Sequence, residues 1–230
     1  MLDCGFGVGE TVSRLSRLRL LPEDLDAIVV THEHEDHIGG VARLARRFDL
    51  PVWLTYGTLS GFESLFADVD ARVIEGYCAF EVGGIEVLPF PVPHDAREPA
   101  QFVFGDGVRR LGVLTDTGEA TRHMERMLSC CDALVLECNH DPDMLRESSY
   151  PQPVKDRIAG RYGHLDNGAA AQLLASLDRS RLQHVVAAHL SQQNNRPELA
   201  RAALGAVLGG DHERIRIAEQ ERGFDWIAVD

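Results

Sequence analysis

The sequence predicts an α/β fold in which two β-sheets lie together and helices cover their outer faces. Short runs rich in β-branched residues alternate with helical stretches along the 230 residues, and strand blocks occur in both halves of the chain. The composition, with 44% hydrophobic and 26% charged residues, is that of an ordinary globular protein. No repeat, low-complexity tract or linker interrupts the chain, so a single domain over 1–230 is expected.

In the first half, strands and helices alternate before a β-rich block. The apolar run AIVVT at 27–31 is typical of a buried strand, and a helix is expected over 38–48, beginning after His37. The other expected elements are strands at 51–55, 71–75, 78–81 and 85–89 and a helix at 56–66. Residues 1–6 resemble the end of a strand that enters in the middle of a fold, so we expect the chain to lack an opening strand and loop.

In the second half, Gly105, Asp106 and Gly107 form a hairpin signal between expected strands at 101–104 and 108–115. The expected elements that follow are helices at 119–128, 154–159, 167–177 and 197–208, strands at 133–138 and 184–188, and a closing strand pair at 214–218 and 224–229.

Charge and cysteine content exclude several classes of protein. The chain carries 36 acidic and 23 basic side chains, a net charge of −13, which argues against a protein that coats nucleic acid through many phosphate contacts. It does not argue against an enzyme that meets phosphate locally. No window approaches the ~20 apolar residues of a membrane span, so no membrane partner is expected. Five cysteines without a C-x-x-C pair indicate a reducing, cytoplasmic setting.

The segment THEHEDHIGG at 31–40 contains the main candidate site. In an extended segment, His32, His34 and Asp36 would project to one side, and His37 would follow where the helix begins. Imidazole and carboxylate groups packed this closely are the donors that first-row divalent metals bind. The alternative is a histidine-rich surface loop, but apolar runs on both sides embed this segment in ordered structure.

Further candidate ligands stand alone after apolar runs. They are His94 in FPVPHDA, Asp116 in VLTDTG and His189 in HLSQQNN. Taken singly, each is either a ligand or an ordinary loop residue. Taken with the first cluster, they supply the donors that a second coordination sphere needs.

These motifs resemble the H-x-H-x-D-H pattern and the later ligands of the metallo-β-lactamase-fold superfamily. The resemblance implies an αββα four-layer sandwich and two divalent metal ions, Zn²⁺ or Mn²⁺, that share an activated water. It implies that one ion is held by His32, His34 and His94, the second by Asp36, His37 and His189, and that Asp116 bridges them. Candidates for orienting these ligands are Glu33, Glu35, Asp95 and Asp141, although the two glutamates could instead face solvent.

Three further strings resemble the YycJ/WalJ group of this superfamily: LVLECNHD at 134–141, YPQPVKDRIAGRYGHLDN at 150–167 and HLSQQNNRPE at 189–198. This likeness implies 5′-to-3′ exonuclease activity by phosphodiester hydrolysis, linked to DNA repair, with DNA favoured over RNA as substrate. The chain departs from the group's pattern at Glu35 and Asp166, where a serine is usual. Asp166 adds negative charge close to the expected phosphate path.

A weaker similarity to tRNA 3′-processing endonucleases of the same fold implies that Glu137 orients His164, which then assists the leaving group. With Asp36, these are the candidate catalytic residues. The candidate substrate-binding residues are Lys155, Arg157, Arg161, Asn139, His140 and Asn194. The alternatives are a helix-entry role for His164, a loop residue that lines the site at His140, and a solvated helix face for the basic residues.

Two other functions stay open at this point. One is a small-molecule hydrolase of the same fold, acting on a cyclic phosphodiester, thioester or lactone. The other is a non-catalytic, metal-stabilised binding module, against which the intact ligand positions argue. The sequence does not distinguish the metal, the direction of digestion or the oligomeric state.

Overall fold

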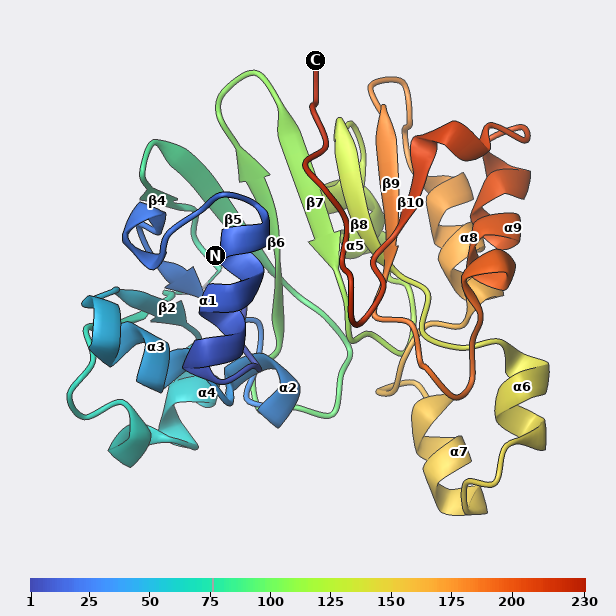
Figure 1. Ribbon diagram of the computed structural model, residues 1–230. Helices are drawn as coiled ribbons and strands as arrows, with labels where there is room; N and C mark the ends of the chain where they lie inside the picture. Colours follow the sequence, from blue (N-terminus) through green and yellow to red (C-terminus); the bar gives the residue numbers. More distant parts are fainter. Residues whose placement is uncertain (76) are drawn as a thin grey trace. The chain divides into compact units, whose positions relative to one another are not determined.

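The computed structural model describes residues 1–75 and 77–230, which divide into two compact units (Figure 1). The first unit comprises residues 1–91 and 96–101, and the second comprises residues 92–95 and 102–230. Each unit combines β-strands with helices, which confirms the predicted α/β class.

The first unit is built around a parallel sheet with the strand order β1 (Ile28–Val29), β2 (Val52–Leu54), β3 (Ala71–Val73). It also contains an antiparallel hairpin of β4 (Phe80–Val82) and β5 (Ile85–Pro91). Its helices are α1 (Val8–Arg17), α2 (Glu35–Ile38), α3 (Val41–Phe48) and α4 (Tyr56–Ser60), with 3-10 turns at Pro22–Asp24 and Glu63–Leu65.

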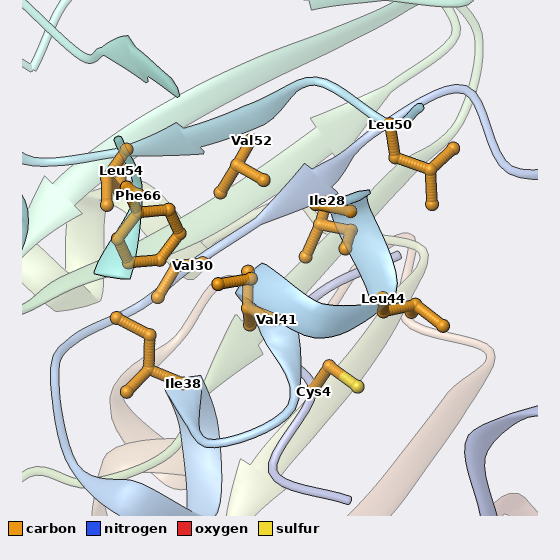
Figure 2. Packing of buried hydrophobic residues seen from close by; sticks show 12 residues of the cluster. Cys4, Ile28, Val30, Ile38, Val41, Leu44, Leu50, Val52, Leu54 and Phe66 are labelled. Carbon is orange, nitrogen blue, oxygen red and sulfur yellow. The ribbon is translucent and has the colours of Figure 1, made fainter. Parts of the chain in front are cut away.

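A compact apolar core supports the carboxyl end of β1 (Figure 2). Val41 and Leu44 recur on one face of α3 and are fully buried with Ile28 of β1 and Val52 of β2. Ile38 of α2 joins the same cluster. The strand end and the short helix that flank the histidine segment are therefore fixed by packing on both sides.

The second unit contains strands in the order β10 (Ile215–Ile217), β9 (His184–Ala188), β8 (Ala133–Glu137), β7 (Arg110–Leu114), β6 (Ala100–Gly105). The first two residues of β6 belong to the first unit. The strands β7, β8, β9 and β10 are parallel, and β6 pairs antiparallel with β7 through the predicted hairpin. The carboxyl ends of β7, β8 and β9 thus meet at one edge, where Leu114, Leu136 and Ala187 lie in register.

The helices of this unit are α5 (Arg122–Leu128), α6 (Pro142–Glu147), α7 (Gln152–Ile158), α8 (Asn167–Ser176) and α9 (Pro197–Val207), with a 3-10 turn at His212–Arg214. Helices α8 and α9 pack against each other (Figure 1). Among the residues described, no helix has both the length and the apolar character needed to cross a membrane.

Several expected elements differ in the structure. The helix expected over 38–48 is divided between α2 and α3, because the Gly40 backbone N–H donates to the Cys4 carbonyl at 2.7 Å. The expected helix over 56–66 ends at Ser60, and a 3-10 turn follows. Of the expected closing strand pair, the strand at 214–218 is present as β10, which pairs with β9, whereas the strand at 224–229 is wrong because these residues form no strand. Helices α1 and α6 were not predicted.

Candidate metal centre

The histidine segment follows β1 and turns into α2 sooner than its sequence predicts. His34 is the N-cap of α2, so Asp36 lies on a helical turn and the extended projection expected for it is wrong. His32 is fully buried, and its Nε2 lies 3.0 Å from Nδ1 of His34. That separation suits two nitrogens that share one ion at about 2.0–2.1 Å each.

Asp3 orients the histidines of this segment, a role that the sequence did not predict. Its carboxylate lies 2.8 Å from Nδ1 of His37 and accepts hydrogen bonds from the backbone N–H and hydroxyl of Thr31, both at 2.8 Å. Because the Thr31 hydroxyl donates to Asp3, it accepts from Nδ1 of His32 at 2.9 Å. In His32 and His37, Nε2 is therefore the candidate metal-binding atom.

We expect Asp3→Ala to weaken divalent-metal binding by about 10- to 100-fold, because it releases His37 directly and His32 through Thr31. Calorimetric titration of the metal-free protein with Mn²⁺ measures this change in affinity. Asp70→Ala is the matched control, since it removes a carboxylate of the same unit that pairs with exposed Arg72. Equal metal affinity in the two variants would contradict the role of Asp3.

Of the residues predicted to orient the ligands, two serve other purposes. Glu33 accepts a hydrogen bond from the Arg97 backbone N–H at 2.8 Å, and Asp141 is the N-cap of α6. Asp95 lies 3.5 Å from Nε2 of His94, and its carboxylate also pairs with Arg157. Glu35 is exposed in the first turn of α2.

In the second unit, three of the predicted ligands lie at or near the edge where the parallel strands end. Asp116 follows β7 and His189 follows β9, with Oδ1 of Asp116 3.5 Å from Nδ1 of His189. His94 lies 3.9 Å from the same oxygen through Nε2, while its Nδ1 donates to the Gly163 carbonyl at 3.2 Å. In His94, too, Nε2 is therefore the candidate ligand atom.

Glu137, the last residue of β8, accepts four hydrogen bonds although it is fully buried. Oε1 accepts from Nδ1 of His164 at 3.0 Å and of His189 at 2.9 Å. Oε2 accepts from the backbone N–H groups of Thr117 and Leu165. Burial raises the pKa of Glu137, but the hydrogen bonds from His164 and His189 outweigh it and hold that pKa below its ordinary value.

Glu137 thus fixes the tautomer of two imidazoles, because it contacts Nδ1 of both His164 and His189. Ligand atoms of Asp116, Glu137, His164 and His189 all lie within 4.8 Å of one another. The sequence predicted the contact of Glu137 with His164, whereas its contact with His189 was not expected.

Three residues of the candidate site have unusual backbone angles. Asp3, Asp116 and His189 have φ angles of 53°, 51° and 58°, in the left-handed region that residues other than glycine seldom adopt. Only seven non-glycine residues of the described chain have such angles. Strain of this kind persists where the surrounding structure enforces it and is typical of functional sites.

Two of the three predicted basic residues, Arg157 and Arg161, are paired with acidic neighbours, and Lys155 contacts a backbone carbonyl. Arg157 lies 3.4 Å from Asp95, Arg161 lies 2.7 Å from Glu119, and Lys155 donates to the Arg146 carbonyl. The two arginine pairs are exposed and therefore contribute little stability, so phosphate can replace the carboxylates at low cost.

The remaining predicted substrate residues belong to the loops that follow β8 and β9. Asn139 donates to the His189 carbonyl at 3.0 Å. His140 and Asn194 are buried, at 2% and 1% exposure, and burial lowers the pKa of His140. Direct contact of these two residues with substrate stays a prediction.

The fold and these donor groups define the class of protein. Residues 1–189 match the model of the beta-lactamase superfamily domain, and the chain belongs to this family of hydrolases. It is 37% identical over 211 residues to the exodeoxyribonuclease YycJ of Bacillus anthracis, covering 90% of this chain and 80% of that protein. It is 34% identical over 205 residues to the exodeoxyribonuclease WalJ of Streptococcus pneumoniae, covering 87% and 76%.

The metallo-β-lactamase-fold protein YhfI of Bacillus subtilis has a similar structure, with a TM-score of 0.72 and 18% identity over 98% of this chain and 85% of that protein. The metallo-β-lactamase fold and the resemblance to the YycJ/WalJ group are thereby confirmed. The imidazoles, oriented by carboxylate and carbonyl acceptors, suit divalent metal ions.

Proposed function

We propose that this protein is a metal-dependent exonuclease that hydrolyses phosphodiester bonds in DNA, in the 5′-to-3′ direction, and serves cytoplasmic DNA repair. One observation carries the proposal. A chain 37% identical to an exodeoxyribonuclease over 90% of its length also carries imidazoles whose ligand nitrogens are fixed by Asp3, Glu137 and the Gly163 carbonyl.

We propose that the candidate donor groups hold two divalent ions, Zn²⁺ or Mn²⁺. His32, His34 and His94 would hold one ion, Asp36, His37 and His189 the other, and Asp116 would bridge them. Bound divalent ions would lower the pKa of water and offset the charge of the phosphodiester.

His164 would donate a proton from Nε2 to the departing oxygen, because Glu137 already accepts from its Nδ1. Its side chain is 18% exposed, so a substrate can reach it, while Glu137 is closed to solvent. The buried carboxylate therefore positions His164 and keeps its Nε2 available.

We expect chelation of bound metal to abolish nuclease activity and added Mn²⁺ to restore it. The assay uses end-labelled single- and double-stranded DNA with a 5′ phosphate. We expect His34→Ala to lose activity at all metal concentrations tested, while His123→Ala, which changes an exposed histidine of α5, keeps it. Full activity of His34→Ala, or an active metal-free protein, would overturn the proposal.

One observation favours the small-molecule alternative. Arg157 and Arg161 already face carboxylates, and the chain carries a charge of −13, which is unfavourable for a long polyanion. A higher kcat/KM on a cyclic phosphodiester, thioester or lactone than on DNA would favour this second function.

A further inference from the structure

Tyr162 is an exposed aromatic residue beside the proposed proton donor. Its side chain is 53% exposed, and it lies two residues before His164, whose ring is 5.4 Å from that of His94. Neither the ligand set nor the hydrogen bonds of Glu137 involve it. We infer that Tyr162 is a stacking platform for an unpaired base of the DNA strand, an inference that rests on the proposed nuclease function.

The backbone under Tyr162 is held rigidly. Its carbonyl accepts from the Asp95 backbone N–H at 3.0 Å, and the next carbonyl, that of Gly163, accepts from His94. A Cβ at Gly118 would lie 2.3 Å from the carbonyl oxygens of Gly160 and Arg161, so the two backbone segments are in close contact. An exposed ring on such a support contributes contact area without the entropy cost of ordering a loop.

The residues around the ring favour nucleic acid. The Arg161 guanidinium lies 5.6 Å from the Tyr162 ring centroid, and Arg157 precedes it on α7. Both arginine side chains are 66% exposed and form surface ion pairs, Arg157 with Asp95 and Arg161 with Glu119. An aromatic ring beside two guanidinium groups that can exchange a carboxylate for a phosphate is suited to bind a base and its flanking phosphates.

This arrangement points to a single-stranded end rather than a duplex. In a duplex, neighbouring base pairs cover the faces of each base, whereas an unpaired base can stack on an aromatic side chain regardless of its identity. A free phosphate would need the arginines but not the ring. The platform therefore predicts a sequence-independent preference for single-stranded or frayed DNA.

The test compares a short 5′-phosphorylated oligothymidylate with the same strand carrying abasic residues at its 5′ end, using the full chain with Mn²⁺. We expect Tyr162→Ala to lower kcat/KM on the normal strand by about 5- to 150-fold. On the abasic strand, its difference from wild type should shrink to less than about two-fold, within ordinary additivity error. Tyr162→Phe should retain the wild-type preference for the normal strand.

Trp226→Ala is the matched control, since Trp226 is an aromatic residue of the second unit that is 69% exposed, and it should behave like wild type. If Tyr162→Ala loses kcat/KM equally on both strands, or loses none, Tyr162 has no stacking role. In that case the nuclease activity of the wild-type protein still supports the proposed function. A wild-type protein that degrades neither strand with Mn²⁺ or Zn²⁺ would overturn both.

Discussion

We expect Glu137→Gln to lower phosphodiesterase activity by on the order of 10³-fold, because it disturbs the proposed metal ligand His189 and the proposed proton donor His164 together. An amide has one oxygen for the two imidazole and two backbone donors that the carboxylate now serves. Its NH₂ group must therefore face either the histidines or the backbone N–H groups of Thr117 and Leu165. Rates at saturating Mn²⁺ and calorimetric metal affinity measure the two effects separately.

Glu147→Gln is the matched control, because it changes an exposed glutamate of α6 whose charge pairs only at the surface with Arg146. It should retain wild-type rates and metal affinity. A Glu137→Gln variant that loses metal affinity but keeps its rate at saturating metal would show that His164 needs no carboxylate. Unchanged values for both quantities would contradict the structural role of Glu137.

Most strands could be predicted because short apolar runs identify buried parallel strands directly. The strand expected at 184–188 agrees with β9 residue for residue. The run at 224–229 has a similar pattern, but Phe224 and Trp226 are 42% and 69% exposed, and the run does not pair with β10, its expected partner. Apolar alternation gives a strand only where the apolar side chains are also buried against a sheet.

The missed helices have weak local signals. Helix α1 follows Gly7, which has no side chain to cap it, and only Thr11 and Leu15 of α1 are buried. Helix α6 spans six residues, too few for an amphipathic period to stand out, and it depends on the Asp141 cap. Both helices depend on tertiary contacts and capping, which the hydrophobic periodicity of the sequence does not predict.

The places of the candidate ligands Asp116 and His189 at the ends of strands were predictable, because polar residues follow apolar strands at a sheet edge. Asp3 was not, because its contact with Thr31 spans 28 residues and depends on the parallel bridge between Leu2 and Val29. The dual contact of Glu137 depends on β8 lying between β7 and β9, which is a matter of strand order. Spacing predicts candidate metal-binding side chains, whereas the residues that contact and orient them depend on topology.

Asp116→Gly should abolish activity while stabilising the metal-free protein by about 1 kcal/mol. Glycine adopts the φ of 51° without the clash that a Cβ causes there, so the strain at this position is released. The substitution also removes a buried carboxylate whose negative charge repels that of Glu137. Activity falls because the proposed bridge between the two ions is lost.

Urea unfolding of the metal-free variants and the DNA assay with Mn²⁺ measure the two changes on the same preparations. Asp225→Asn removes an exposed charge near the chain end and should alter neither quantity. A lower unfolding midpoint for Asp116→Gly would mean that Asp116 supports the fold and that its backbone angle reflects no functional strain. A higher midpoint with full activity would remove Asp116 from the metal centre. Greater stability together with lost activity is the result expected only if the strained aspartate is retained for catalysis.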